Sequence, residues 1–313
     1  MNLLSIIAAL ILEQLRPLSD SRALIRPLSR YARFLENQFN DGQSRHGTIA
    51  WFLAVAPPVI GLAGLDAWLW AYQPLFLPVV NIAVLYLTVG FRQFSHYFTD
   101  IHLALRIGDP AEARRVLAEW RRGAGDRLSS GEIARLAIEQ ALICSHRHVF
   151  APLVWFAVFG PAGALLYRMA MFFDAEWGCR DDAEFGSFGW FSRRAFYFID
   201  WFPLRLTATA FAVVGDFEDA IYCWRTQASR WPDSSGILLA SGAGAVGVRL
   251  GLPIHEDLAT EEVGSVMRDR PELGLGDEAD ADLMQSAIGL VWRTLVLGLL
   301  LVGLVWVASW VGH

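Results

Sequence analysis

The stretch that decides the fold runs from Thr48 to Phe91 and reads TIAWFLAVAPPVIGLAGLDAWLWAYQPLFLPVVNIAVLYLTVGF. Its first part, from Thr48 to Tyr72, has Asp66 as its one charged residue. It is long enough to cross a bilayer, because about 20 apolar residues span the hydrocarbon core as a helix. After the turn at Gln73-Pro74, a second apolar run from Leu75 to Phe91 is expected to cross back. The sequence therefore predicts a membrane-spanning helical hairpin.

Arginines indicate the side of the membrane from which this hairpin enters. The arginines that precede the first run are Arg16, Arg22, Arg26, Arg30, Arg33 and Arg45. The turn between the two runs contains none. Because basic residues stay on the cytoplasmic side, the turn is predicted to lie outside. We expect a multi-pass protein of the bacterial inner membrane.

The composition supports this class and excludes others. Of 313 residues, 54% are hydrophobic and 19% are charged, against roughly 25% charged in soluble domains. These values exclude a disordered, fibrous or disulfide-stabilised protein. The net charge is −6 and no basic patch is interleaved with aromatics, so nucleic-acid binding has no support. All 26 basic residues are arginine, which excludes a Walker-type lysine loop and a Schiff-base lysine.

Residues 93–147 are predicted to form a cytoplasmic helical insertion. Asp109 precedes Pro110, and Ser129 precedes Glu132 by three positions; both patterns open amphipathic helices. The insertion is expected to be part of one domain that covers residues 1–313.

The remaining apolar runs are short or interrupted. Val149–Phe173 contains the pair Gly160-Pro161, so it is predicted to be a broken or re-entrant segment. Leu3–Leu12 and Trp201–Val214 are too short to cross alone, and the latter is expected to start near Pro203. The predicted fold class is all-α: a polytopic helical membrane protein with a cytoplasmic helical insertion and short or re-entrant membrane helices.

An acidic loop, residues 252–285, precedes the last apolar run, Ala287–Val311, which is predicted to span the membrane. We expect the loop to be a solvated linker in which Asp277 or Asp280 caps the terminal helix.

Charged side chains beside lipid are costly and usually face a partner or a polar cavity. Two groups qualify as candidate ligand-binding residues: Asp174 with Arg168 and Arg180, and Asp200 with Arg205. The second group could equally be a buried ion pair that fixes the turn. No catalytic residue is assigned and no metal site is expected.

Several segments together have a specific order and spacing, although no one of them is decisive. They are Arg26-Pro27, LALRIGDPAEARRVLAEWRRGAGDRLSSGEIARLAIE (103–139), FAPLVWF (150–156), LYRMAMFFDAEWG (166–178), FIDWFPLRL (198–206) and SSGILLASGAGAVGVRLG (234–251). In this pattern the chain resembles the CobD/CbiB membrane proteins of cobalamin biosynthesis and their relative AmpE over nearly its whole length.

The resemblance implies an activity and adds a site residue. In the enzymatic branch, adenosylcobinamide-phosphate synthase joins an aminopropanol phosphate to adenosylcobyric acid through an amide, using ATP and Mg²⁺. Glu139, Asp174, Asp200 and Arg205 match the family's site. From its spacing alone, Glu139 would instead form a surface ion pair with Arg135, four positions earlier.

The chain also departs from the enzymes at acidic and amide positions. After Glu139, where the enzymes resemble E-x-x-x-E-N-x-x-D-G, it reads EQALICSHRH. Met171 and Leu239 stand where an Asn and a Glu are expected. Such losses leave few ligands for a metal–nucleotide complex. FIDWFPLRL looks closer to AmpE, a membrane protein connected with cell-wall sensing that lacks this carboxylate set.

We therefore expect an AmpE-like, non-catalytic sensor or interaction protein with a degenerate synthase site. Its expected partners are the lipid bilayer, an unidentified small molecule or protein, and a second copy of the chain. The alternative is the synthase itself, an ATP- and Mg-dependent amide-forming ligase, and only then are ATP and Mg²⁺ expected cofactors. A transporter is the third class, because of the Gly160-Pro161 break.

Overall fold

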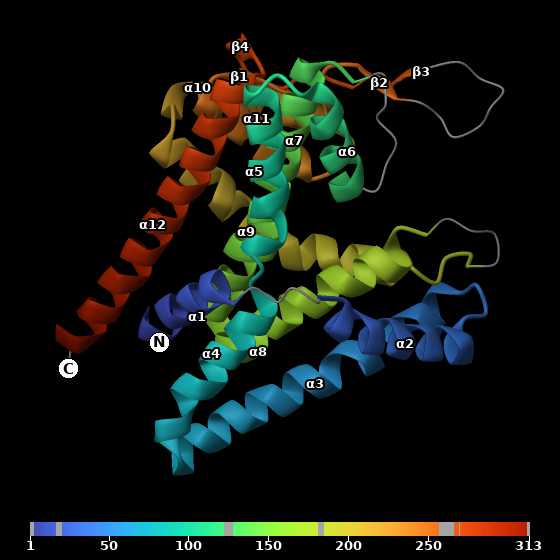
Figure 1. Cartoon of the computed structure of the whole chain (residues 1–313). Coiled ribbons are helices and arrows are strands. Elements are labelled where there is room, and N and C mark those ends of the chain that lie inside the picture. Colours follow the sequence, from blue (N-terminus) through green and yellow to red (C-terminus); the bar gives the residue numbers. More distant parts are fainter. Residues whose placement is uncertain are drawn as a thin grey trace. The chain divides into compact units, whose positions relative to one another are not determined.

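The computed structural model describes residues 3–16, 21–121, 128–180, 185–256, 266–268 and 270–311. It divides into two compact units. The first comprises Met1–Gly90, His148–Pro203 and Ala308–His313, and the second Phe91–Arg147 and Leu204–Val307. Both consist mainly of helices (Figure 1).

The predicted class, an all-α membrane protein, is confirmed. Within the described residues, three helical stretches are long and apolar enough to cross a membrane: Ser44–Tyr72, Ser130–Gly178 and Ala281–Ala308.

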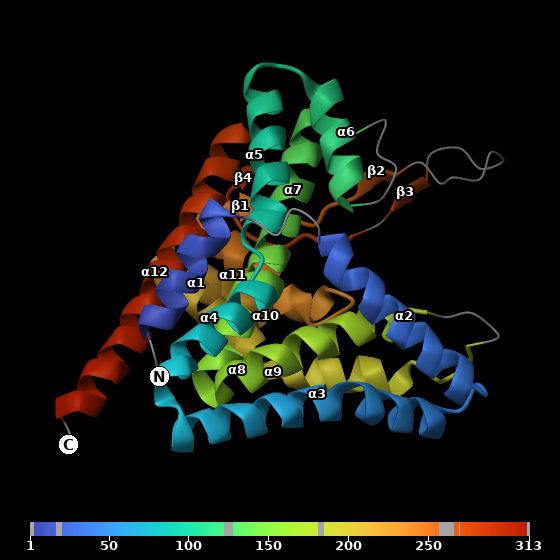
Figure 2. The ribbon, with the colours of Figure 1, turned by 60° about the horizontal axis from the view of Figure 1, so that its bottom comes forward.

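The first unit is built around the long helix α3. Its elements are α1 (Leu3–Leu15), α2 (Ser21–Phe39), α3 (Ser44–Tyr72), η1 (Pro74–Phe76), α4 (Leu77–Thr88), α8 (Ala151–Phe173), η3 (Asp174–Gly178) and the first part of α9 (Trp190–Val214). Helix α3 packs against α2, α4 and α8, and α1 packs against α4 (Figure 2). Large aromatic side chains fill the core, including Trp51, Tyr167, Phe173, Trp177 and Phe188.

The hairpin prediction is right for its first arm only. Helix α3 covers the first apolar run, but α4 has 12 residues and ends at Thr88, because Val89 has extended backbone angles. At 1.5 Å per residue α4 is roughly 18 Å long, short of the ~30 Å hydrocarbon core. The second run is therefore not one continuous spanning helix.

Two other segments test the role of proline and glycine. Gly160, at φ 65° and ψ −153°, interrupts α8, which confirms the predicted break. Pro203, by contrast, lies inside α9, a helix of 25 residues that begins at Trp190. The expected short run opening near Pro203 is thus wrong, because the helix is already formed by the residues upstream.

The second unit contains the predicted helical insertion. Its elements are α5 (Arg92–Arg106), α6 (Pro110–Arg121), α7 (Ser130–Ser145), the start of η2 (His146–Phe150), the end of α9, α10 (Phe217–Gln227), η4 (Ala228–Arg230), α11 (Ser235–Val246), four short strands and nearly all of α12 (Ala281–Val311). Helix α5 packs against α6 and α7, and α10 packs against α11 (Figure 1).

The local start signals of these helices are confirmed. Ser129 and Glu132 form a full capping box at α7. The side chain of Asp109 accepts from the N–H of Glu112 at 3.1 Å, and that of Asp280 accepts from the N–H of Leu283 at 2.7 Å at the start of α12.

The acidic segment is more than a solvated linker. β1 (Val248–Arg249) pairs in parallel with β4 (Asp277–Glu278), and β2 (Ile254–Glu256) pairs antiparallel with β3 (Val266–Arg268). Leu273 is fully buried. Residues 257–265 and 269 lie outside the described residues. The rest of the segment therefore contributes backbone pairing and core to the second unit.

Candidate functional site

Glu139 lies at the centre of a buried polar group in the second unit. Its side chain projects from α7, and the residue is 5% exposed. Oε1 accepts the backbone N–H of Gly251 at 2.9 Å, and Oε2 accepts from Nη2 of Arg270 at 2.5 Å. A buried carboxylate is strongly destabilising unless it is paired and hydrogen-bonded, and these two contacts satisfy it.

Two arginines accompany this carboxylate. Arg135, one turn earlier on α7 and 8% exposed, donates from Nη2 to the carbonyl of Pro253 at 3.2 Å. The guanidinium of Arg270 lies 4.9 Å from the ring centroid of Trp231. We call Arg135, Glu139, Trp231, Gly251 and Arg270 the Glu139 cluster. The expected surface pair between Arg135 and Glu139 is wrong, since both are buried and the carboxylate pairs with Arg270.

Each of these arginines keeps one buried donor without a hydrogen bond in the described part of the chain. The atoms are Nε of Arg135 and Nη1 of Arg270. Arginine presents its N–H groups in a planar fork that matches carboxylate and phosphate oxygens. The cluster therefore contains two N–H donors that no described group uses.

A tight turn aims the Gly251 N–H at Glu139. Gly251 has φ +71°, a left-handed conformation, and Leu252 follows with φ +56°. The carbonyl oxygen of Pro271 approaches Gly251 so closely that a Cβ there would overlap it. Glycine is thus required at this position both by its backbone angles and by the lack of space.

Asp200 and Asp174 belong to the first unit. The hydroxyl of Tyr167 donates to Oδ1 of Asp200 at 2.8 Å, and both side chains are buried. The carboxylate of Asp174 lies against the Cα of Gly178, where a larger residue would overlap it.

The predicted arginine partners of Asp174 make other contacts. Arg168 forms a hydrogen bond with Nδ1 of His148 at 2.6 Å, and no described bond joins it to Asp174. Arg180 pairs with Glu36 of α2 at 2.8 Å, and its guanidinium lies 4.4 Å from the ring centroid of Phe185. The grouping of Asp174 with Arg168 and Arg180 stays a prediction.

The structure distributes the candidate residues over both units. Asp174, Asp200, Arg168 and Arg180 lie in the first unit, and Glu139 and Arg205 in the second. Arg205 is half-buried on α9. Its pairing with Asp200, and a single site formed by all six residues, stay predictions.

Sequence reasoning missed three members of the Glu139 cluster. Arg270, Gly251 and Trp231 are far from Glu139 in the sequence, and no fixed spacing links them to it. The order Gly251-Leu252-Pro253 does signal a turn. A turn signal alone does not say which side chain the turned backbone will contact.

The described acidic residues form no cluster that could enclose a metal ion by itself. Among residues 3–16, 21–121, 128–180, 185–256, 266–268 and 270–311, no group of three His, Cys, Asp or Glu side chains could hold a metal ion. Both oxygens of Glu139 are engaged by other groups of the protein. Mg²⁺ is usually held by one or two carboxylates together with substrate phosphates and water, so it does not require such a group.

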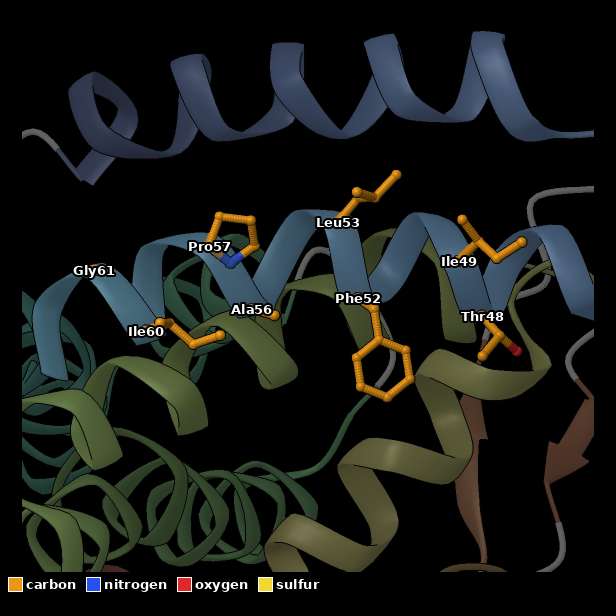
Figure 3. Close-up of a pocket in the computed structure, with 8 residues that line it drawn as sticks. All are labelled: Thr48, Ile49, Phe52, Leu53, Ala56, Pro57, Ile60 and Gly61. Carbon is orange, nitrogen blue, oxygen red and sulfur yellow. The ribbon is translucent and has the colours of Figure 1, made fainter. Parts of the chain in front are cut away.

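An apolar groove runs along α3 in the first unit (Figure 3). Its lining residues are Thr48, Ile49, Phe52, Leu53, Ala56, Pro57, Ile60 and Gly61. The hydroxyl of Thr48 is its one side-chain polar group and donates to the carbonyl of Ser44 at 2.9 Å. The groove thus offers apolar surface but no acid or base.

Comparison with known proteins identifies the relatives of this chain. A family model described as "CobD/Cbib protein" matches residues 6–310. The chain belongs to the CobD/Cbib family. A relative from Stutzerimonas stutzeri (strain A1501), "Cobalamin biosynthesis protein CobD", is 36% identical over 296 residues, 92% of this chain and 93% of the relative.

Further relatives in the CobD/Cbib family carry the same description. The one from Chromobacterium violaceum is 36% identical over 231 residues, 73% of this chain and 71% of the relative. The one from Photorhabdus laumondii is 29% identical over 207 residues, 62% of this chain and 64% of the relative. No solved structure matches the chain. Membership of this family and the apolar helices together identify a membrane protein.

Proposed function

We propose that the protein acts in cobalamin biosynthesis as an amide-forming enzyme of the adenosylcobinamide-phosphate synthase type, located in the bacterial inner membrane. The observation that carries this proposal is the similarity over 92% of the chain to a relative described as a cobalamin biosynthesis protein. The substrates implied by the resemblance are adenosylcobyric acid and an aminopropanol phosphate.

The Glu139 cluster supports a role in holding the phosphate of the smaller substrate. Nε of Arg135 and Nη1 of Arg270 are the donors still available there. A phosphate binds best to arginine N–H groups that are already oriented. Glu139 and the ring of Trp231 orient the Arg270 guanidinium through contacts on its edge and face.

Amide formation also requires that the carboxyl group of adenosylcobyric acid be activated. ATP would supply this activation. No step is assigned to a divalent metal. The contribution assigned to this chain is to bind the phosphate and to keep Arg270 in place.

A second candidate is the AmpE-like, non-catalytic sensor or interaction protein. One observation favours it: Glu139, which the resemblance places in the synthase site, has both oxygens engaged by Gly251 and Arg270. In this case the cluster would stabilise the fold of the second unit and bind no substrate.

Growth of a bacterial strain that lacks the synthase separates the two candidates. With cobyric acid as the corrinoid, the synthase proposal expects the full chain to restore growth; cobinamide, which already carries the aminopropanol amide, is the positive control. Failure to grow on cobyric acid, with the protein present in the membrane, would overturn the synthase proposal.

Single variants test whether growth depends on the Glu139 cluster. Arg135→Gln is expected to lower complementation at least tenfold while the protein still accumulates in the membrane. Arg225→Gln, on an exposed part of α10, is the matched control and should grow like the wild type. Undiminished growth of Arg135→Gln would remove the phosphate-binding role.

A further inference from the structure

Helix α2 carries its positive charges on one side. Arg22, Arg26, Arg30 and Arg33 follow one another at intervals of four, four and three residues. At about 100° per residue they fall within an arc of roughly 80° around the helix axis. The side chains of Arg26, Arg30 and Arg33 are exposed. These three arginines, Arg26, Arg30 and Arg33, are called the arginine stripe.

The charge of this stripe is not neutralised by the described residues. Arg26 and Arg30 form no ion pair or hydrogen bond with any of them. Arg33 donates from Nε to the carbonyl of Ser29, which leaves its charge uncompensated. The acidic residue of α2 is Glu36, and Arg180 pairs with it.

The opposite side of α2 is fixed to the first unit. Ala32 and Leu35 are buried in the same core as Ala50 and Ala54 of α3. Figure 3 shows α2 running beside α3, with Leu53 directed toward it.

Polar contacts hold α2 in the same orientation. The hydroxyl of Tyr31 donates to the carbonyl of Leu53 at 3.1 Å, and that of Ser29 donates to Glu176 at 3.1 Å. The arginine stripe is therefore held facing away from the core, next to the first half of a membrane-spanning helix.

An exposed aromatic side chain lies beside the stripe. Phe34 is 58% exposed and falls about 40° from Arg30 around the helix axis. A helix with arginines on one face and exposed aromatics beside them is typical of helices that lie at the boundary between headgroups and acyl chains. The positive-inside rule places this segment on the cytoplasmic side, where anionic lipids give the membrane surface a negative potential.

We propose that α2 docks on the anionic lipid surface of the leaflet that α3 enters, and that its arginine stripe binds phospholipid phosphate groups. Charge complementarity and the continuity of α2 with the spanning helix α3 argue for this occupant. The proposal concerns how the protein sits in the membrane and does not depend on the proposed function.

The test uses the full chain in lipid nanodiscs and a fluorophore on α2. Asn37 is exposed and lies in the same arc as the stripe, so an Asn37→Cys variant carries the label; Cys179→Ser removes the exposed native thiol. The readout is quenching of the fluorophore by a lipid with a nitroxide on its headgroup. We expect at least twofold more quenching in discs with 30% phosphatidylglycerol than in pure phosphatidylcholine.

Three sets of variants decide whether the stripe causes this difference. R26Q/R30Q/R33Q should abolish the preference for phosphatidylglycerol, whereas R26K/R30K/R33K should keep most of it, because charge is retained. R106Q/R225Q/R230Q removes the same charge from exposed positions of the second unit and should leave the preference unchanged. The melting temperature of each variant in detergent checks that it is folded.

Several outcomes would overturn the proposal. One is equal quenching in both kinds of disc, and another is a preference that survives in R26Q/R30Q/R33Q. A third is loss of the signal when millimolar glycerol phosphate is added, because it would show a site for a soluble phosphate rather than a lipid surface.

Discussion

Glu139 and Arg270, which are 131 positions apart in the sequence, meet through Oε2 and Nη2 at 2.5 Å. Their side chains are 7% and 13% exposed, so the pair is largely shielded from water. Removing one member of such a pair leaves the other charge buried and uncompensated. The contact therefore links α7 to the segment before α12 in the second unit.

This relationship predicts the outcome of a double-mutant cycle. Glu139→Gln and Arg270→Gln should each lower the free energy of unfolding by about 3 kcal/mol, the low end of the range for breaking a buried pair. The double variant should lose clearly less than the sum of the two. Apparent melting temperatures in detergent measure the series. Glu112→Gln, which breaks an exposed pair with Arg115, is the control and should show little change. Strict additivity would contradict the assigned pair.

The turn at Gly251 gives a second prediction. Gly251→Ala places a Cβ on a left-handed backbone and against the carbonyl of Pro271. It should lower the free energy of unfolding by more than about 2 kcal/mol. Gly247→Ala has a similar φ of +76° but open space around it, and it should cost about 1 kcal/mol. Equal melting temperatures for the two variants would show that the close approach at Gly251 is absent.

The break in α8 gives a third prediction. Gly160 has φ 65° and ψ −153°, a region that residues with a Cβ essentially do not occupy. Gly160→Ala should therefore destabilise by about 1–3 kcal/mol or straighten the helix. Gly64→Ala in α3, where a Cβ would meet nothing within 4 Å, is the matched control and should be close to neutral. A neutral Gly160→Ala would argue against the break.

The three cysteines give a fourth prediction. Cys179 is exposed, whereas Cys144 and Cys223 are buried. Burial, reinforced by the charge of Asp219, raises the pKa of the Cys223 thiol to about 11. The reactive thiolate is then about a thousandth of the population at pH 8, and a higher pH increases it.

Maleimide labelling of single-cysteine variants measures this difference. The variant that keeps Cys179 should react at least tenfold faster at pH 8 than the one that keeps Cys223. Unfolding in detergent should remove the difference, and similar rates in the folded protein would contradict the burial of Cys223.

Much of the fold could be predicted because its signals are local. The apolar run from Thr48 to Tyr72, the capping box at Ser129 and the break at Gly160 each depend on residues within a few positions of one another. The backbone of α10 approaches Gly244 of α11 too closely to leave room for a Cβ. The continuity of α9 through Pro203 could not be predicted in this way. It depends on the helical turns between Trp190 and Pro203, which are already formed when the chain reaches the proline.

The partners of the charged residues in the candidate site could not be predicted from local sequence signals. The sequence by itself determined the membrane class, the helix starts and the presence of charged residues beside apolar runs, since composition and periodicity specify these. The tertiary structure decided the partners of those charges: Glu139 contacts Arg270 and Gly251, and Arg168 contacts His148. From the sequence, Glu139 and Arg135 are expected to form a surface ion pair because they are four positions apart. In the folded chain both residues are buried. Burial then makes distant backbone and side-chain groups their partners, because an unsatisfied charge in the interior is too costly.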